Sequence, residues 1–154
     1  MTKCRKGDLL AIPVAGDQVA VAQIIEPLKG NVLVAVHPDL FDAARVEEAE
    51  SLSLDEPVLF AETMDLRIKD GTWPVVGNRE VPAGISAPTF KVWVEPPGEF
   101  RAQDVHGTVG QPLSPGEAER LRLHTSYSPA LIEHAIRAYH GHGPWLDAFD
   151  ELTV

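Results

Sequence analysis

The chain has 154 residues, of which 44% are hydrophobic, and it carries a formal net charge of −10. This length fits one domain or a domain with an appendage, with enough apolar residues for one sizeable core. Nucleic acid and anionic lipid are repelled by such an acidic surface, so the charge argues against both as partners and favours a basic one.

The N-terminal segment predicts a cytoplasmic protein. Its basic start resembles the first part of a signal peptide, but Asp8, Pro13 and Asp17 interrupt the apolar run that would have to follow. No stretch of the sequence reaches the ~18 apolar residues of a membrane span. Cys4 is the single cysteine, which excludes an intrachain disulfide and suits a reducing compartment.

Residues 6–25 predict a β-hairpin. Two apolar runs rich in β-branched residues flank a short turn at Gly16 and Asp17. A third apolar strand is expected over residues 32–36, and it should end at residues 37–39 because Pro38 holds the preceding residue extended. Three strands joined by such short turns predict an antiparallel meander.

The middle of the chain carries weaker signals. Residues 43–50 are rich in Ala and Glu and predict a short helix, and residues 58–61 predict a strand. Residues 64–68 fit either a strand or a helical turn. Side chains alternate most clearly over residues 90–94, and a further strand is expected over residues 100–105.

Helix signals replace strand signals near the C-terminus. Ser114, Pro115 and Glu117 form a capping-box pattern that starts a helix, and Ser128-Pro129 repeats the start signal. The predicted fold class is α+β, mainly β: an antiparallel meander or small open β-barrel of about six strands, followed by two short C-terminal helices. We expect a β-rich domain over residues 1–107 and a C-terminal helical extension over residues 108–154, packed on the same domain.

Most of the negative charge lies in one stretch. Between Asp39 and Asp65 there are nine carboxylates against Arg45 alone, a net charge of −8. Such a run is either a solvated face or a protein-binding patch, because focused charge attracts a basic partner and raises its rate of association. Trp93 is a candidate interface anchor, since tryptophan is enriched in hot spots. The candidate partner-binding residues are Asp39, Asp42, Glu47, Glu48, Glu50, Asp55, Glu56 and Trp93.

Catalytic signatures are missing from the sequence. There is no Gly-x-Ser-x-Gly elbow, no phosphate-binding glycine loop and no His-Glu-x-x-His, so we predict no catalytic residue and no cofactor. The basic residues next to Cys4 are expected to lower the pKa of its thiol somewhat.

The histidines do not have the spacing of metal ligands. Glu133, His134, His140 and His142 form the densest group of suitable residue types. The histidines are not separated by three or four residues, so we predict no metal site, and the histidine at the helix end would interact with the helix dipole instead. The other three, His37, His106 and His124, are expected at the surface or in turns.

Two parts of the chain resemble a known family. Lys6-Gly7-Asp8, Leu10-Ala11-Ile12-Pro13-Val14 and Val21-Ala22-Gln23-Ile24-Ile25 resemble the opening of the immunity protein 26 family, which has a Gly-Asp, an apolar strand ending in Ile-Pro and a second strand with a Gln-Val-like ending. Asp70-Gly71-Thr72-Trp73-Pro74-Val75-Val76-Gly77-Asn78 resembles the later Gly-x-Trp-x-Ile-Gly element of that family. The resemblance covers about residues 5–95 and leaves the helical tail outside.

The resemblance implies an immunity protein of a bacterial polymorphic toxin system. Such a protein is not an enzyme: it binds a cognate toxin stoichiometrically and blocks it. The implied partner is a protein toxin, which is basic if it acts on nucleic acid, and neither nucleic acid nor a membrane is expected to bind. Two alternatives stay open: a small metal-dependent hydrolase that uses the C-terminal histidines, and a generic β-barrel protein-interaction module.

Overall fold

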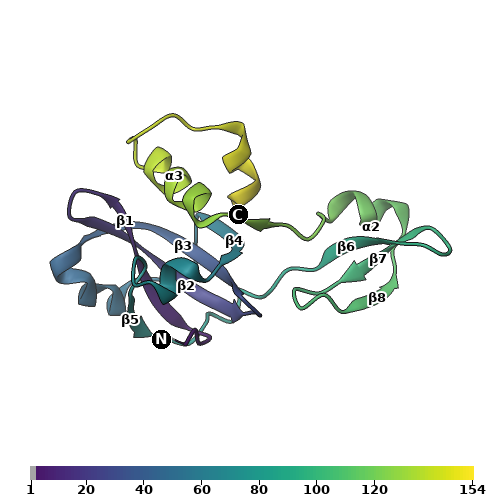
Figure 1. Cartoon of the computed structure of the whole chain (residues 1–154), viewed down its shortest axis with the longest axis horizontal. Coiled ribbons are helices and arrows are strands. Elements are labelled where there is room, and N and C mark those ends of the chain that lie inside the picture. The colour runs from purple at the N-terminus through teal and green to yellow at the C-terminus, as the bar shows by residue number, and fades with distance from the viewer. Residues whose placement is uncertain (1–2) are drawn as a thin grey trace. The chain divides into compact units, whose positions relative to one another are not determined.

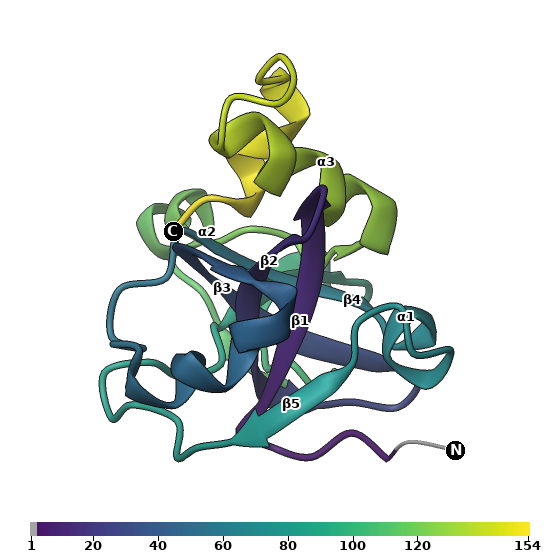
Figure 2. The same cartoon turned by 90° about the vertical axis from the view of Figure 1, so that its left-hand side faces the viewer.

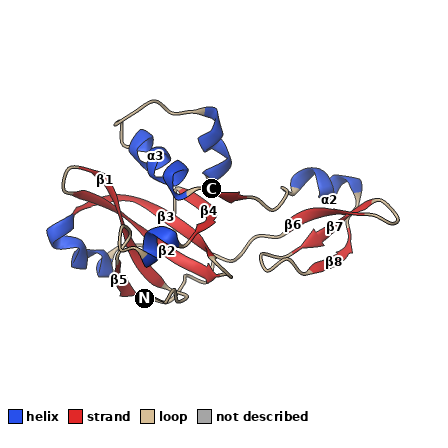
Figure 3. Ribbon diagram, viewed as in Figure 1, coloured by secondary structure: helices blue, strands red, loops and turns tan. Residues whose placement is uncertain are grey.

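The computed structural model describes residues 3–154, and within this range the protein is α+β and mainly β, as predicted (Figures 1 and 3). One sheet has six strands in the order β5-β1-β2-β3-β4-β9, and a second has three strands in the order β6-β7-β8. The strands are β1 (Asp8–Ala15), β2 (Gln18–Pro27), β3 (Asn31–Asp42), β4 (Leu59–Met64), β5 (Val75–Asn78), β6 (Phe90–Val94), β7 (Glu99–Gln103), β8 (Val109–Pro112) and β9 (Ser126–Tyr127). The helices are η1 (Ala43–Ser51), α1 (Leu66–Lys69), α2 (Pro115–Arg120), α3 (Pro129–Tyr139) and η2 (Asp147–Leu152), of which η1 and η2 are 3₁₀ helices.

The predicted meander is the centre of the larger sheet. Strands β1 to β4 pair in sequence order and antiparallel, and β9 joins the edge of β4 in parallel. The sheet stays open, because β5 and β9 form its two edges. None of the helices in residues 3–154 has the length and apolar composition needed to cross a bilayer.

The chain groups into two compact units. Unit 1 contains the six-stranded sheet, with the residues up to Ile85 and from Ser126 onward, and unit 2 contains Ser86–Thr125. The expected division after residue 107 falls inside unit 2, between β7 and β8. The two C-terminal helices also belong to different units, because the chain returns to the larger sheet as β9 before α3 begins.

Both faces of the larger sheet are covered. Leu10 and Ile12 of β1 belong to a core that includes residues of α3 and η2, whereas Leu9, which faces the other side of the sheet, belongs to a second core with Ala49 of η1. Both faces can be covered because alternate side chains of a strand point to opposite faces, and neither set is polar in these strands. Figure 2 shows β5 beside β1 and the C-terminal end of β1 directed at α3.

Strand β3 is longer than predicted. Val36 pairs with Ala22 and Leu40 pairs with Ala20, so three residues of β3 lie opposite a single residue of β2. Pro38 lies inside this bulge, where its missing N–H removes no ladder hydrogen bond. The prediction that the strand ends at residues 37–39 is therefore wrong, since the bulge accommodates the proline.

Unit 2 has little buried apolar surface. Within the described residues its buried apolar side chains are Val105 and Ala118. Lys91 of β6 lies over the ring of Phe100, with Nζ 4.9 Å from the ring centroid, and its Nζ donates to the carbonyl of Ala118 in α2 at 2.7 Å. The predicted capping box is present, with Ser114 accepting from the backbone of Glu117.

Candidate functional site

Seven of the nine carboxylates in the acidic stretch form an exposed surface on unit 1. Glu62 and Asp65, the other two, are buried, where Glu62 accepts from Asn31 at 2.8 Å and Asp65 pairs with Lys69 at 3.1 Å. The exposed seven come from the end of β3, from η1 and from the link between η1 and β4. We call them the acidic surface: Asp39, Asp42, Glu47, Glu48, Glu50, Asp55 and Glu56.

The local sequence explains how the acidic surface is presented. Asp42 ends β3 and caps η1, with its Oδ1 accepting from the backbone N–H of Ala44 at 2.9 Å. Ala49 of η1 is buried in the second core, and Leu52 and Leu54 follow it there. The apolar side chains therefore anchor the segment, while the glutamates of η1 stay in solvent.

Arg79 connects this segment to the sheet. Its Nη1 donates to the carbonyl oxygens of Ala49 and Leu52, at the end of η1. The backbone of Arg79 is itself fixed, because its carbonyl accepts from Gln23 Nε2 at 2.8 Å and its N–H donates to the carbonyl of Gly7 at 2.9 Å. A short 3₁₀ helix has poor hydrogen-bond geometry on its own, so these long-range contacts hold the acidic surface in place.

The acidic surface keeps an excess of negative charge, although the guanidinium of Arg79 lies at the end of η1. It contributes seven negative charges against Arg45 alone in residues 39–56, a net charge of −6. Ion pairs join Arg67 to Glu133, Lys69 to Asp65 and Arg101 to Glu99, and none of these three involves the seven carboxylates. Unit 2 has five carboxylates and four basic residues, so it contributes only −1 to the net charge of the chain. The negative field is therefore concentrated on unit 1.

His37 is buried close to the acidic surface. It is 1% exposed, and neither ring nitrogen has a hydrogen-bond partner within the described residues. Burial, together with the charge of Arg79, lowers the pKa of His37 to about 4, although Asp39 and Asp55 oppose the shift. The prediction of a surface or turn position for His37 is wrong, because the residue lies at the start of the bulge, in a strand of a sheet that is covered on both faces.

Trp93 belongs to unit 2 and is 51% exposed. Its Nε1 donates to Glu95 Oε1 at 2.8 Å, and its ring meets Phe100 edge-on at a centroid distance of 4.9 Å. The indole is thus held by its neighbours and presents part of its surface to solvent. The eight predicted partner-binding residues therefore divide between the two units, seven on unit 1 and Trp93 on unit 2.

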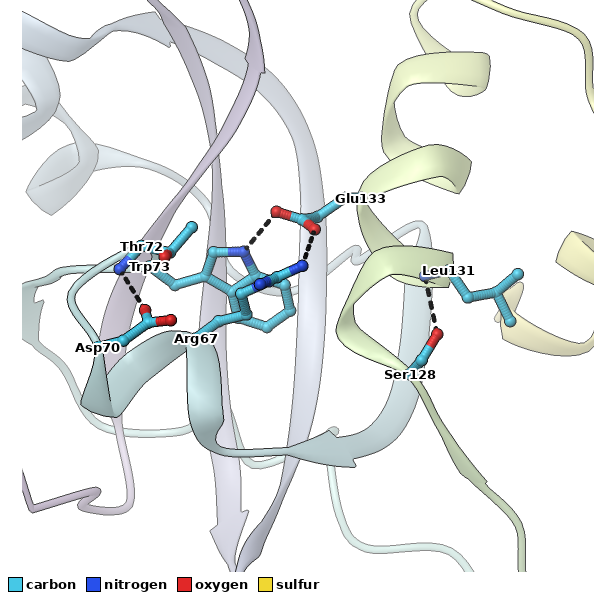
Figure 4. Close-up of polar contacts among 7 residues, drawn as sticks. All are labelled: Arg67, Asp70, Thr72, Trp73, Ser128, Leu131 and Glu133. Atoms are coloured by element: carbon cyan, nitrogen blue, oxygen red, sulfur yellow. Dashed lines mark hydrogen bonds and ion pairs between the residues drawn. The ribbon is translucent and has the colours of Figure 1, made fainter.

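Glu133 has a structural role. Its Oε2 accepts from the indole N–H of buried Trp73 at 3.2 Å, and its Oε1 pairs with Arg67 Nη2 at 3.3 Å (Figure 4). The carboxylate therefore joins α3 to the segment around α1, and Ser128 caps the start of the helix. No group of three or more His, Cys, Asp or Glu residues in the described chain is arranged to hold a metal ion.

The pKa of the Cys4 thiol is raised, whereas the basic residues next to it in sequence predict a lowered one. Burial raises the pKa of its thiol, and the carboxylate of Asp65 acts in the same direction, while Lys69 opposes them. The basic neighbours in sequence therefore do not set its environment, since residues that are distant in sequence lie closer in the fold.

Comparisons of the chain with protein-family models, with curated proteins and with solved structures found no match. The interpretation of the acidic surface therefore depends on its own geometry and charge.

Proposed function

We propose that this protein is a non-catalytic binding protein of the immunity type, which neutralises a cognate bacterial toxin by direct stoichiometric binding. The observation that carries the proposal is the acidic surface: seven exposed carboxylates, none in an ion pair with a described residue, on a segment anchored to the sheet. A basic protein surface is the partner that matches this charge.

The residues that carry the family resemblance support the proposal by their placement. The two resembling stretches are far apart in the sequence, yet β1 and β5 pair, with Leu9 opposite Gly77. Asn78 Nδ2 donates to Asp8 Oδ1 at 2.9 Å, so the Gly-Asp of the first stretch contacts the end of the second. Arg79, the next residue, holds the acidic segment. The resembling residues thus build the part of the sheet to which the acidic surface is attached.

Anchoring matters for an inhibitor because binding costs less when the surface is already ordered. Complementary charge also accelerates encounter, by roughly 10- to 1,000-fold at low ionic strength. An inhibitor that acts by covering a toxin needs such a surface and no catalytic group. The proposal therefore assigns the acidic surface to binding and assigns no residue to turnover.

Charge reversal with affinity capture tests the proposal. Tagged wild-type protein is used to capture partners from a lysate of its source organism, and the retained proteins are identified by mass spectrometry. The test variant carries Glu47→Lys, Glu48→Lys and Glu50→Lys. The control variant has the same net charge but reverses three exposed carboxylates outside the acidic surface, Glu80, Glu119 and Asp147.

The expected result is one basic protein that is retained by the wild type and the control variant, released by high salt and lost from the test variant. Expression of that protein alone should stop growth, and co-expression with the wild type but not with the test variant should restore it. If both variants retain the captured protein equally, the binding surface does not depend on Glu47, Glu48 and Glu50 and lies elsewhere. A captured protein that is harmless when expressed would contradict the immunity function.

A further inference from the structure

A cavity lies at the C-terminal end of α3. Its volume is about 300 Å³, which is at the lower end of the range for small-molecule sites. Side chains of α3, the loop that follows it and η2 form its walls: His134, Arg137, His142, Gly143, Pro144, Leu146 and Phe149.

The fold determines how this cavity is built. His134 and Arg137 are three residues apart in α3 and so lie on one side of the helix. Gly141, with φ of +81°, turns the chain back after the helix, and the N–H of His142 donates to the carbonyl of Arg137 at 2.8 Å. Arg137 Nε donates to the carbonyl of Val14 at 3.1 Å, which fixes the guanidinium against the end of β1.

The formal charge on the cavity wall is positive and comes from Arg137, in contrast to the net charge of −10 on the chain. Three nitrogen-bearing side chains line it, and no carboxylate does. Glu133, the acidic residue next to His134, is engaged by Trp73 and Arg67. The outer guanidinium nitrogens of Arg137 and the imidazoles of His134 and His142 make no hydrogen bond to any residue in the described range, so their donors are available.

The remaining wall is apolar. Phe149 is buried in the main core, and Leu146 and Pro144 complete the wall beside it. A ligand that fills this space needs a charged group for the nitrogens and an apolar body for the opposite wall. An arginine guanidinium presents parallel N–H donors that match the two oxygens of a carboxylate.

We propose that this cavity binds a small organic acid, with its carboxylate on Arg137, His134 and His142 and its apolar body against Leu146 and Phe149. This site is separate from the acidic surface and does not depend on the toxin-neutralising function. An organic acid of this kind can be a free metabolite or the C-terminal residue of a peptide, because both present a carboxylate beside an apolar group.

Benzoate is the probe for the test, and benzamide, which has the same shape without the charge, is its control. Binding is followed by NMR shifts of backbone amides in the full chain. The test variants are Arg137→Gln and the double variant His134→Ala/His142→Ala. The matched controls are Arg45→Gln and His106→Ala, which remove an exposed arginine and an exposed histidine elsewhere. A short peptide ending in phenylalanine, compared with its C-terminal amide, distinguishes the two sources of carboxylate.

The expected result is a saturable shift confined to the end of α3 and the loop before η2. We expect benzamide to bind at least about tenfold more weakly than benzoate, and both test variants to weaken benzoate binding by a similar factor, with the control variants unchanged. If Arg137→Gln fails to fold because the bond to Val14 is lost, the double histidine variant decides the question, since both imidazoles are exposed. Equal binding of benzamide, or no saturation up to about 10 mM benzoate, would overturn the proposal.

Discussion

The buried imidazole of His37 makes the stability of unit 1 depend on pH. The perturbation is His37→Gln, which keeps a neutral polar side chain of similar size and removes the titrating group. His106→Gln is the control, because His106 is exposed in unit 2. The comparison between His37→Gln and the wild type isolates the proton that His37 binds.

The magnitude follows from the pKa of His37, which is lowered from 6.5 to about 4 in the folded protein. Between these pH values the unfolded chain binds a proton that the folded chain does not, so stability falls as the pH falls. Above pH 6.5 the stability contributed by this group is fully present, and at pH 4 the loss approaches roughly 3 kcal/mol at about 1.4 kcal/mol per pKa unit. At pH 5 the loss is about 2 kcal/mol by the same relation.

Urea denaturation at a series of pH values from 8 to about 4 measures this effect. Fluorescence of the buried Trp73 reports on unit 1 when Trp93 and Trp145 are replaced by Phe. We expect the free energy of unfolding of the wild type to fall relative to that of His37→Gln as the pH drops below 6.5, and His106→Gln to follow the wild type. A constant difference between His37→Gln and the wild type across this range would refute the reasoning, because it would show that His37 has the same pKa in both states.

Three further changes have defined outcomes. Gly7→Ala should lower the free energy of unfolding by more than about 2 kcal/mol, because Gly7 has φ of +88° and a Cβ there would collide with a backbone carbonyl. Gly71→Ala should lower it by about 1 kcal/mol, because Gly71 has φ of +83° but open space around it. Urea denaturation of both variants therefore separates the cost of the backbone conformation from the cost of the collision. Glu133→Ala should cost about 1–3 kcal/mol, since it leaves the indole N–H of buried Trp73 without its acceptor, and Glu133→Gln, which keeps an acceptor, should cost less in the same assay. Ser114→Ala should cost about 1 kcal/mol of helix stability in unit 2 through loss of the cap of α2, which amide hydrogen exchange in α2 would detect, and unchanged exchange would contradict it.

The sequence predicted the strands whose side chains carry a repeating pattern. The first hairpin and residues 90–94 follow from alternation and turn residues, which are local properties. Strands β8 and β9 were missed because they have four and two residues, too few for a pattern to show. The grouping into two units depends on the chain returning to pair with β4, a contact across more than sixty residues that no local pattern indicates.

Part of the candidate site was also predictable, because it depends on a local property of the sequence. Composition alone identified the acidic stretch, because exposed carboxylates need no particular partner. The residues that support it were not identified: Gln23 of β2 fixes the backbone of Arg79, and Arg79 holds the end of η1. Trp93 was grouped with the carboxylates by residue type, and the structure places it in the other unit.

The acidic surface lowers the stability of the folded chain, and the contacts that anchor it to the sheet raise it. Residues 39–56 carry seven carboxylates against Arg45, and the repulsion within such an excess of one charge destabilises the folded chain at low ionic strength. The contacts of Arg79 with Ala49 and Leu52, and the burial of both residues, offset this repulsion and keep the segment ordered. The basic partner that we propose would offset this excess of negative charge as it binds.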